Sequence, residues 1–421
     1  MMTFSRPVEL YPRLAATSAV GLGLVLSLAI LTLWISEGWI GFAIEGAVFV
    51  LAALWAARMA FSPVSVRLSG VLVPLSIPAV IGAIQLAVVS TVNGWATRNA
   101  LLGWGACWAA TFIGLQIGSS DGVRQAFRRG LLYFGFAVAI LSVLQFFTSP
   151  DKIFWLFQGE YAEPALGPFL SHDRYAAFVE LVLPLALYEA FEGQAVAVSY
   201  AAMAGAMVAS VIAGASRAGS ILVLAESAVV LLLLSRDRVS RRPQAGKIAA
   251  WFAMFVVLFV AVVGWTRQWE RFQDPNPYRY RREILLSTAA MIRERPWLGF
   301  GLGTFETVYP AYARFDSGEV VNHAHNDWAE WAAEGGLPMA AALLMVMVWA
   351  GRAAVRSPWG LGLISVAIHS FVDFPLQDRA LSLWAFTLLG VMIAGVQIRK
   401  TVATRGRASS NSPPPAAVRA R

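Results

Sequence analysis

The amino-acid sequence predicts an all-α membrane protein that crosses a bilayer about twelve times. Hydrophobic residues make up 58% of the 421 residues, whereas charged residues make up 14%. Soluble domains have about 25% charged residues, so this chain has more apolar side chains than a soluble core buries. These side chains also fall in runs that approach the roughly 20 residues that a helix needs to cross a bilayer.

Twelve apolar segments fit transmembrane helices, and packed membrane helices tolerate the Gly and Pro residues that interrupt several of them. The segments lie near residues 14–36, 39–57, 69–91, 99–118, 124–147, 175–191, 195–214, 218–235, 248–266, 337–351, 358–372 and 380–398. The first is too long for the apolar part of a signal peptide, so we expect it to be retained. We therefore divide the chain into an N-terminus (1–13), spans one to nine (14–266), a long loop (267–336), spans ten to twelve (337–398) and a tail (399–421).

The distribution of Lys and Arg predicts the orientation in the membrane, because cytoplasmic loops carry more of both. With the N-terminus inside, we expect the basic loop 236–247 and the basic tail to be cytoplasmic and the loop 267–336 to be extracytoplasmic. The tail is rich in Pro and Ser and is expected to be disordered. The net charge of +8 thus reflects orientation and the tail and does not indicate nucleic-acid binding. The single cysteine, Cys107, excludes a disulfide framework.

The long loop is unusually basic for an outer segment. It carries eight arginines, at positions 267, 271, 279, 281, 282, 293, 295 and 314. Such a cluster suits an anionic partner, which is either lipid phosphate at the membrane surface or a phosphate-bearing substrate that guanidinium groups bind bidentately. Apolar residues recur at helical spacing from 281 to 294, so we expect an amphipathic helix that ends before Pro296. The glycines of the following "GFGLGTF" favour a tight turn over a nucleotide cradle.

The stretch "VNHAHNDWAEWAAEGGLPM" gathers two of the four histidines and three acidic residues at the start of the tenth span. Histidine suits general-base catalysis near neutral pH. His323, His325 and Asp327 also offer three metal ligands, but a complete zinc site needs a further ligand and a second shell. We therefore predict no metal and no cofactor.

Five motifs resemble the O-antigen ligase and polymerase superfamily over roughly residues 160–390. They are "GPFLSHDRYAAFVELVLPLAL", "SRAG", "RREILLSTAAMIRERPWLGFGLGTF", "HAHNDWAEWAAEGGLP" and "HSFVDFPLQ". His325, Asn326 and Gly336 match the family's spacing, whereas Met339 replaces a final glycine. Asp173 and Arg174 stand where relatives often carry Asn-His.

The resemblance implies a GT-C-type helical bundle in the bacterial inner membrane whose active site faces the periplasm. It implies metal-independent, inverting transfer of a glycan from undecaprenyl diphosphate to lipid A–core or to another glycan. His325 would be the general base, and Arg217 and Arg281 match arginines of the family that would bind the donor diphosphate. Further donor-binding candidates are Arg282 and Arg174, and the supporting candidates are His323, Asn326, Asp327 and Asp373.

Two alternatives remain open. A polymerase of the same superfamily would more typically show two comparable basic outer loops, so the single large loop favours a ligase. A polysaccharide transporter or flippase would concentrate ionisable residues inside its spans. The predicted spans contain few such residues, namely Glu45, Glu180 and Glu226, which makes the transporter the weaker alternative.

Overall fold

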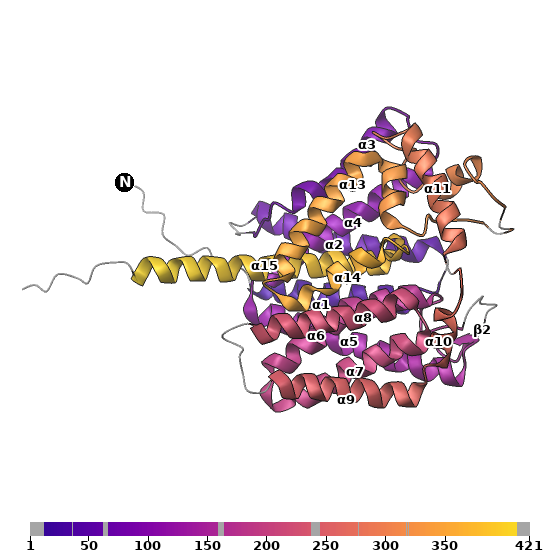
Figure 1. Ribbon diagram of the computed structural model, residues 1–421. Coiled ribbons are helices and arrows are strands. Elements are labelled where there is room, and N and C mark those ends of the chain that lie inside the picture. The colour runs from indigo at the N-terminus through magenta and orange to yellow at the C-terminus, as the bar shows by residue number, and fades with distance from the viewer. Residues whose placement is uncertain are drawn as a thin grey trace, which may run out of the picture.

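The computed structural model describes residues 12–35, 37–61, 66–158, 164–236, 245–276, 278–316, 318 and 320–410. It confirms an all-α polytopic membrane protein, with helices packed side by side along most of their length (Figure 1). The described β-structure is small: the antiparallel pair β1 (Lys152–Ile153) and β2 (Phe157–Gln158), and an isolated bridge between Leu166 and Phe169.

Each of the twelve predicted segments coincides with a helix. In the described chain, nine helices are long and apolar enough to cross a membrane: α1 (Pro12–Leu31), α2 (Gly38–Phe61), α4 (Gly94–Gly118), α5 (Asp121–Thr148), α7 (Ala197–Gly214), α8 (Arg217–Arg236), α9 (Ala245–Val263), α13 (Asp327–Ala354) and α15 (Arg379–Ser410). The other three are α3 (Leu72–Ala87), α6 (His172–Glu192) and α14 (Gly362–His369), which follows the 3-10 turn η3 (Pro358–Gly360). Nine crossings are therefore supported by length and composition, and the count of twelve stays a prediction.

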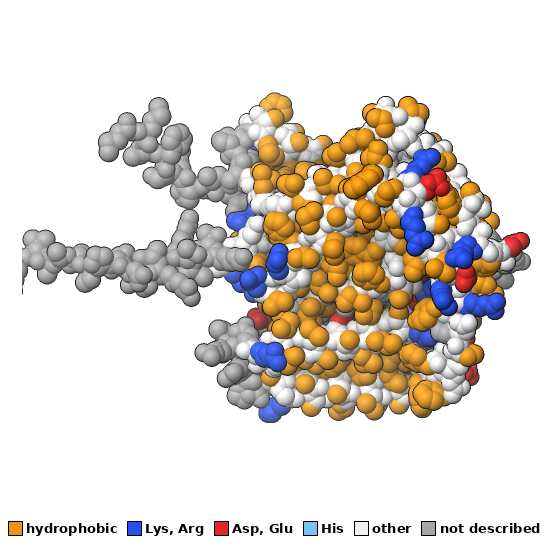
Figure 2. All heavy atoms as spheres, turned by 45° about the horizontal axis from the view of Figure 1, so that its top comes forward, with side chains coloured by type: hydrophobic (Ala, Val, Ile, Leu, Met, Phe, Trp, Pro, Cys, Tyr) orange, Lys and Arg blue, Asp and Glu red, His pale blue; other side chains and the backbone are white. Residues whose placement is uncertain are grey.

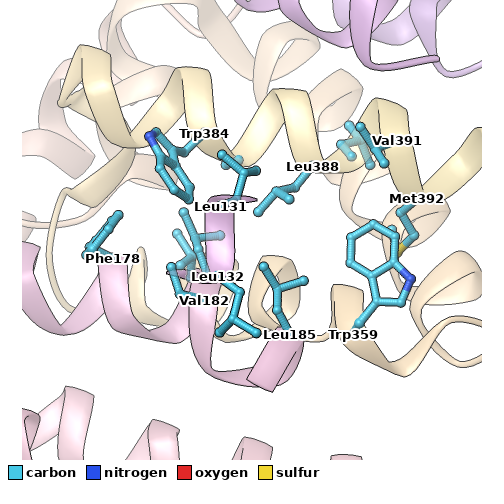
Figure 3. Close-up of a cluster of buried hydrophobic side chains, with 14 of the residues drawn as sticks. Leu131, Leu132, Phe178, Val182, Leu185, Trp359, Trp384, Leu388, Val391 and Met392 are labelled. Atoms are coloured by element: carbon cyan, nitrogen blue, oxygen red, sulfur yellow. The ribbon is translucent and has the colours of Figure 1, made fainter. Parts of the chain in front are cut away.

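Helix α15 lies at the centre of the bundle and α9 at its edge. The apolar part of α15 is 89% buried inside the protein, whereas that of α9 is 11% buried. Figure 3 shows the core around α15, where Trp384, Leu388 and Met392 face side chains of α5, α6 and η3. The apolar runs thus serve two purposes, since some face other helices and others cover the outside of the bundle.

The surface shows the same division. Hydrophobic side chains cover the middle of the face drawn in Figure 2, and Lys and Arg gather toward its ends. Inside, Arg128 and Arg129 of α5 form ion pairs with the buried Glu189 of α6. Since an unpaired buried charge is strongly destabilising, this contact holds α5 against α6.

The predicted boundaries need two corrections. Helix α15 continues to Ser410, so residues 399–410 of the tail are helical rather than disordered; residues 1–11 and 411–421 lie outside the described residues. Helix α13 begins at Asp327, where Asn326 caps its first turn, and its second segment begins after the break at Gly336, in agreement with the span predicted from residue 337. The last part of the predicted loop 267–336 is therefore helical.

The remainder of that loop contains α10 (Thr266–Phe272), α11 (Arg279–Glu294), α12 (Phe305–Val308) and the 3-10 turn η2 (Tyr309–Ala311). Helix α11 confirms the predicted amphipathic helix, and it buries Ile284 and Met291 against the loop's own small apolar cluster. Helices α10 and α11 lie at the right of Figure 1, while the last turns of α15 extend to the left. The candidate residues accordingly gather at one end of the bundle.

Candidate functional site

The histidine motif is held in place by the start of α13. The Asn326 side chain accepts a hydrogen bond from the Ala329 backbone N–H and donates one to the Phe371 carbonyl. The first contact caps the helix, and the second fastens it to the segment between α14 and α15. His325, directly before the cap, has a φ of 49°, an uncommon conformation for a residue with a side chain. The supporting role predicted for Asn326 is therefore structural here.

His325 contacts a carboxylate that is 48 residues away in the sequence. Its Nδ1 lies 3.2 Å from Asp373 Oδ1, and its ring meets the edge of Phe374 at 4.9 Å. Asp373 is buried, whereas the His325 side chain is 30% exposed. A carboxylate on Nδ1 fixes the tautomer of an imidazole and leaves Nε2 free to accept a proton. The pair thus has the geometry of a general base and the group that orients it.

His323 has a different environment. Its Nδ1 lies 2.8 Å from Glu330 Oε1, and its ring stacks on Phe374 at 4.4 Å. Burial, and then the positive charge of Arg174, lower the pKa of His323 to about 4. Its imidazole is therefore neutral at neutral pH and binds the first turn of α13, which suits a supporting residue.

Asp327 and Glu334, two of the acidic residues in the histidine motif, accept hydrogen bonds from neighbouring segments. Asp327 accepts hydrogen bonds from the Ser370 hydroxyl at 2.7 Å and the Leu376 N–H at 3.1 Å. Glu334 accepts hydrogen bonds from the Gly303 and Phe305 N–H groups, both at 2.9 Å. Both carboxylates therefore fasten loops to α13.

The glycine-rich segment forms the tight turn that its sequence predicts. Gly299, Gly301 and Gly303 all have positive φ, a region that favours glycine. Gln85 of α3 closes the turn, since its amide donates to the Leu298 and Glu334 carbonyls and accepts from the Leu302 N–H. The turn is a structural element that packs against the first half of α13.

Gly336 divides α13 into two segments. Its φ is 77° and its ψ is 173°, and the Leu337 N–H donates to the Pro296 carbonyl at 2.7 Å. Three residues after Gly336, the fully buried Met339 packs with Ile81 and Leu343. A methionine thus fills the place where the family pattern has a glycine.

We expect Gly336→Ala to destabilise the protein, because a Cβ would lie 2.3 Å from the Trp297 carbonyl oxygen in addition to the positive φ. Strain of this kind costs about 1–3 kcal/mol. Thermal unfolding in detergent measures the effect. Gly46→Ala is the control, because a Cβ at Gly46 meets nothing within 4 Å, and equal melting temperatures for the two variants would contradict the prediction.

Arg281 of α11 joins three segments of the site. Its Nη2 lies 2.9 Å from Asp173 Oδ2 and 3.6 Å from Asp373 Oδ1, and its Nη1 donates to the Val372 carbonyl at 2.6 Å. Burial alone would lower the pKa of Arg281, but Asp373 and Asp173 raise it. A permanent positive charge therefore lies next to the carboxylate that contacts His325.

Arg217, at the start of α8, meets Arg281 at one aromatic ring. The guanidinium carbons of Arg217 and Arg281 lie 5.4 and 5.9 Å from the centre of the Tyr278 ring. Arg217 also donates to the Arg271 carbonyl at 3.0 Å and lies 3.5 Å from Asp274. The two arginines predicted to act together thus come together from helices far apart in the sequence.

A pocket of about 380 Å³ opens beside Arg217, lined by Arg217, Arg267, Glu270, Arg271 and Asp274. Arg271 Nη1 also lies 2.9 Å from His172 Nε2. Three arginines against two acids give the pocket a net positive charge, which suits an anionic group.

The remaining arginine candidates lie elsewhere. Arg174 lies 3.6 Å from Asp378 and 5.0 Å from the centre of the Phe374 ring, on the histidine side rather than in the Arg217 pocket. Arg282 is exposed on α11. The sequence therefore predicted that these residues lie at the same end, but not which of them share a pocket.

Three contributors were not among the predicted site residues: Asp173, Tyr278 and Arg271. The sequence singled out Asp173 only because it departs from the family pattern. In the structure, its carboxylate accepts hydrogen bonds from Arg281 and from the Ser216 hydroxyl. Its neighbour in sequence, the predicted candidate Arg174, was the clearest signal that this turn belongs to the site.

The alternative metal site is not assembled. His323 turns to Glu330, His325 to Asp373 and Asp327 to Ser370. Among the residues that the structure describes, no group of three or more His, Cys, Asp or Glu side chains is placed to hold a metal ion.

Comparison with protein families identifies the part of the chain that carries these residues. Residues 202–344 match the family model described as O-antigen ligase. This segment resembles the O-antigen ligases. The matched segment runs from α7 into α13 and includes Arg217, Arg281, His323 and His325, whereas Asp173 and Asp373 lie outside it. No curated protein matches the chain. The match shows what this segment is similar to, and the long apolar helices fit a multi-pass membrane protein.

Proposed function

We propose that this O-antigen ligase-like protein transfers a glycan from undecaprenyl diphosphate to the lipid A–core of lipopolysaccharide on the periplasmic face of the inner membrane. The observation that carries the proposal is the meeting of His325, Asp373 and Arg281 at one end of the bundle. It places a candidate base, the carboxylate that orients it and a permanent cation in contact.

In this mechanism His325 removes the proton of the acceptor hydroxyl as that oxygen attacks the anomeric carbon. Asp373 orients the ring through Nδ1 and stabilises the imidazolium that forms. The bond from the anomeric carbon to the diphosphate oxygen breaks as the new bond forms on the opposite face, which inverts the configuration. His323 positions the start of α13 and takes no proton.

Arg217 and Arg281 bind the donor diphosphate and stabilise the charge that grows on it as it leaves, which is how fixed cations assist a leaving anion. The Arg217 pocket and the shared contact with Tyr278 support this assignment. Arg282 and Arg174 add positive charge to the same end of the bundle. Because the arginines supply the positive charge, the proposed reaction needs no metal ion.

The profile of lipopolysaccharide in a deletion strain tests the function. We expect loss of all long-chain lipopolysaccharide and accumulation of the lipid-linked polymer. A core that carries a single repeat unit would instead identify a polymerase. An unchanged profile would contradict both activities.

The proposed orientation has its own test. We expect alkaline phosphatase fused after position 315, in the loop that contains α11 and α12, to be active, since this enzyme matures only in the periplasm. Fusion after Val355, at the far end of α13, is the matched control and is expected to be inactive. The reverse pattern would place the candidate site on the cytoplasmic side and overturn the assignment.

A further inference from the structure

A second pocket lies at the same end of the bundle; it is lined by Arg379 but not by Arg217 or Arg281. It has a volume of about 320 Å³ and lies among α2, α4, α13 and α15. None of these helices supplies Arg217 or Arg281. Its lining includes Phe42, Trp95, Asn99, Trp104, Trp331 and Gln377.

Aromatic rings form much of this pocket. Trp104 meets Trp331 at 5.8 Å and Phe386 at 5.9 Å, both edge to face, so three rings form one fixed cluster. Trp95, in the first turn of α4, is 68% exposed. Aromatic walls with a few polar groups are the usual lining of small-molecule sites, and rigid rings offer flat apolar faces on which the C–H face of a sugar packs.

Two polar side chains at the pocket have buried atoms without a hydrogen-bond partner among the described residues. The Gln377 Nε2 atom is buried without a hydrogen-bond acceptor, and both oxygens of Glu45 are buried without a hydrogen-bond donor. Arg379 Nε lies 3.2 Å from Glu45 Oε1, an ion-pair distance without hydrogen-bond geometry. Glu45 borders the pocket, because a Cβ on the lining residue Gly103 would lie 3.4 Å from Oε1. Leaving such groups unpaired is unfavourable, so they point to a ligand that both donates and accepts.

The pocket adjoins the candidate base. Gln377 follows by three residues Phe374, whose ring contacts both His323 and His325. Trp331 is four residues, or about 6 Å, along α13 from Asp327. The segment 374–377 therefore has His325 near one end and the aromatic pocket at the other.

We propose that this pocket binds a sugar residue of the acceptor glycan and thereby presents its hydroxyl to His325. This inference rests on the proposed function. The volume of the pocket, about 320 Å³, is at the lower end of the range of about 300–1,000 Å³ for ligand sites. Such a volume suits a single sugar ring rather than a polymer. The pocket suits a sugar better than a phosphate, because it offers aromatic faces and the unbonded amide of Gln377, and because its cation, Arg379, already lies beside Glu45.

Steady-state kinetics of the purified full-length protein test this inference, with lipid-linked donor and with the core oligosaccharide released from lipopolysaccharide of the source strain. We expect Trp95→Ala and Gln377→Ala each to raise the KM for the oligosaccharide about 5- to 10-fold, with the KM for the donor within twofold of wild type. Trp297→Ala is the matched control, because this tryptophan is 72% exposed and does not line the pocket. Melting temperatures establish that each variant is folded.

Saturation-transfer NMR with the same oligosaccharide and no donor measures binding without turnover. Loss of the signal in Trp95→Ala but not in Trp297→Ala supports the inference. If wild type binds the oligosaccharide through Trp95 but transfers nothing, the proposed function fails and the saccharide site stands. If transfer is normal and both pocket variants keep the wild-type KM for the acceptor, or change only the KM for the donor, the inference is overturned.

Discussion

His325→Ala is expected to reduce glycan transfer about 10²- to 10⁴-fold, the usual cost of losing a general base. The lipid-linked donor should still bind, because the arginines that we assign to its diphosphate are on α8 and α11. The measurement is turnover of purified donor and acceptor at matched protein concentration, together with the Kd for the donor. His325→Ala also removes the contact to Asp373. Asp373→Asn tests that contact separately, and it should lower turnover while leaving the histidine in place.

His323→Ala is the matched control for that experiment, because the two histidines contact the same Phe374 ring. We expect a smaller loss, together with a lower melting temperature, since His323 binds Glu330 in the first turn of α13. The pKa of His323 is lowered to about 4, so most of its imidazole stays neutral down to pH 5. If His323→Ala is inactive while His325→Ala keeps wild-type turnover, the assignment of the base is wrong.

Arg281→Lys is expected to reduce transfer about 10- to 100-fold, although the charge is kept. The guanidinium spans the Val372 carbonyl and the Asp173 carboxylate with two different nitrogens, and a single ammonium group cannot occupy both positions. The KM for the donor and kcat should both change, because the substitution disturbs the proposed phosphate contact and the neighbour of Asp373. We expect Arg217→Lys to act mainly on the KM for the donor, since Arg217 contacts neither Asp373 nor His325 in the described contacts.

Arg293→Lys is the control for these substitutions, because Arg293 is exposed on the same helix as Arg281. It should transfer at the wild-type rate. Wild-type donor affinity and turnover in both Arg281→Lys and Arg217→Lys would limit these arginines to contacts within the protein and with lipid headgroups.

Composition and periodicity by themselves determined the class of this protein. An excess of apolar residues over what a soluble core holds requires contact with lipid, and lipid leaves the backbone little choice but helices. The spacing of Ile284 and Met291 likewise determined α11, and the glycines at 299, 301 and 303 determined a tight turn. Each of these features depends on residues close together in the chain. The same local information located the segment of α13 that follows Gly336, but it missed the short segment from Asp327 to Gly335, because the cap by Asn326 was not recognised.

Only the tertiary structure decided which side chains meet. Asp173 and Arg281 are 108 residues apart, and His325 and Asp373 are 48 residues apart, and no local pattern specifies such pairs. They form because the first turns of α6, α11 and α13 and the segment after α14 lie at one end of the bundle, where side chains that cannot enter lipid find partners of opposite charge. Packing also separated Asp327 and Glu334 from the histidines beside them in the sequence. Both carboxylates accept hydrogen bonds from backbone N–H groups of neighbouring loops. Burial makes an unpaired carboxylate costly, and the loops that supply its partners are brought there by the fold.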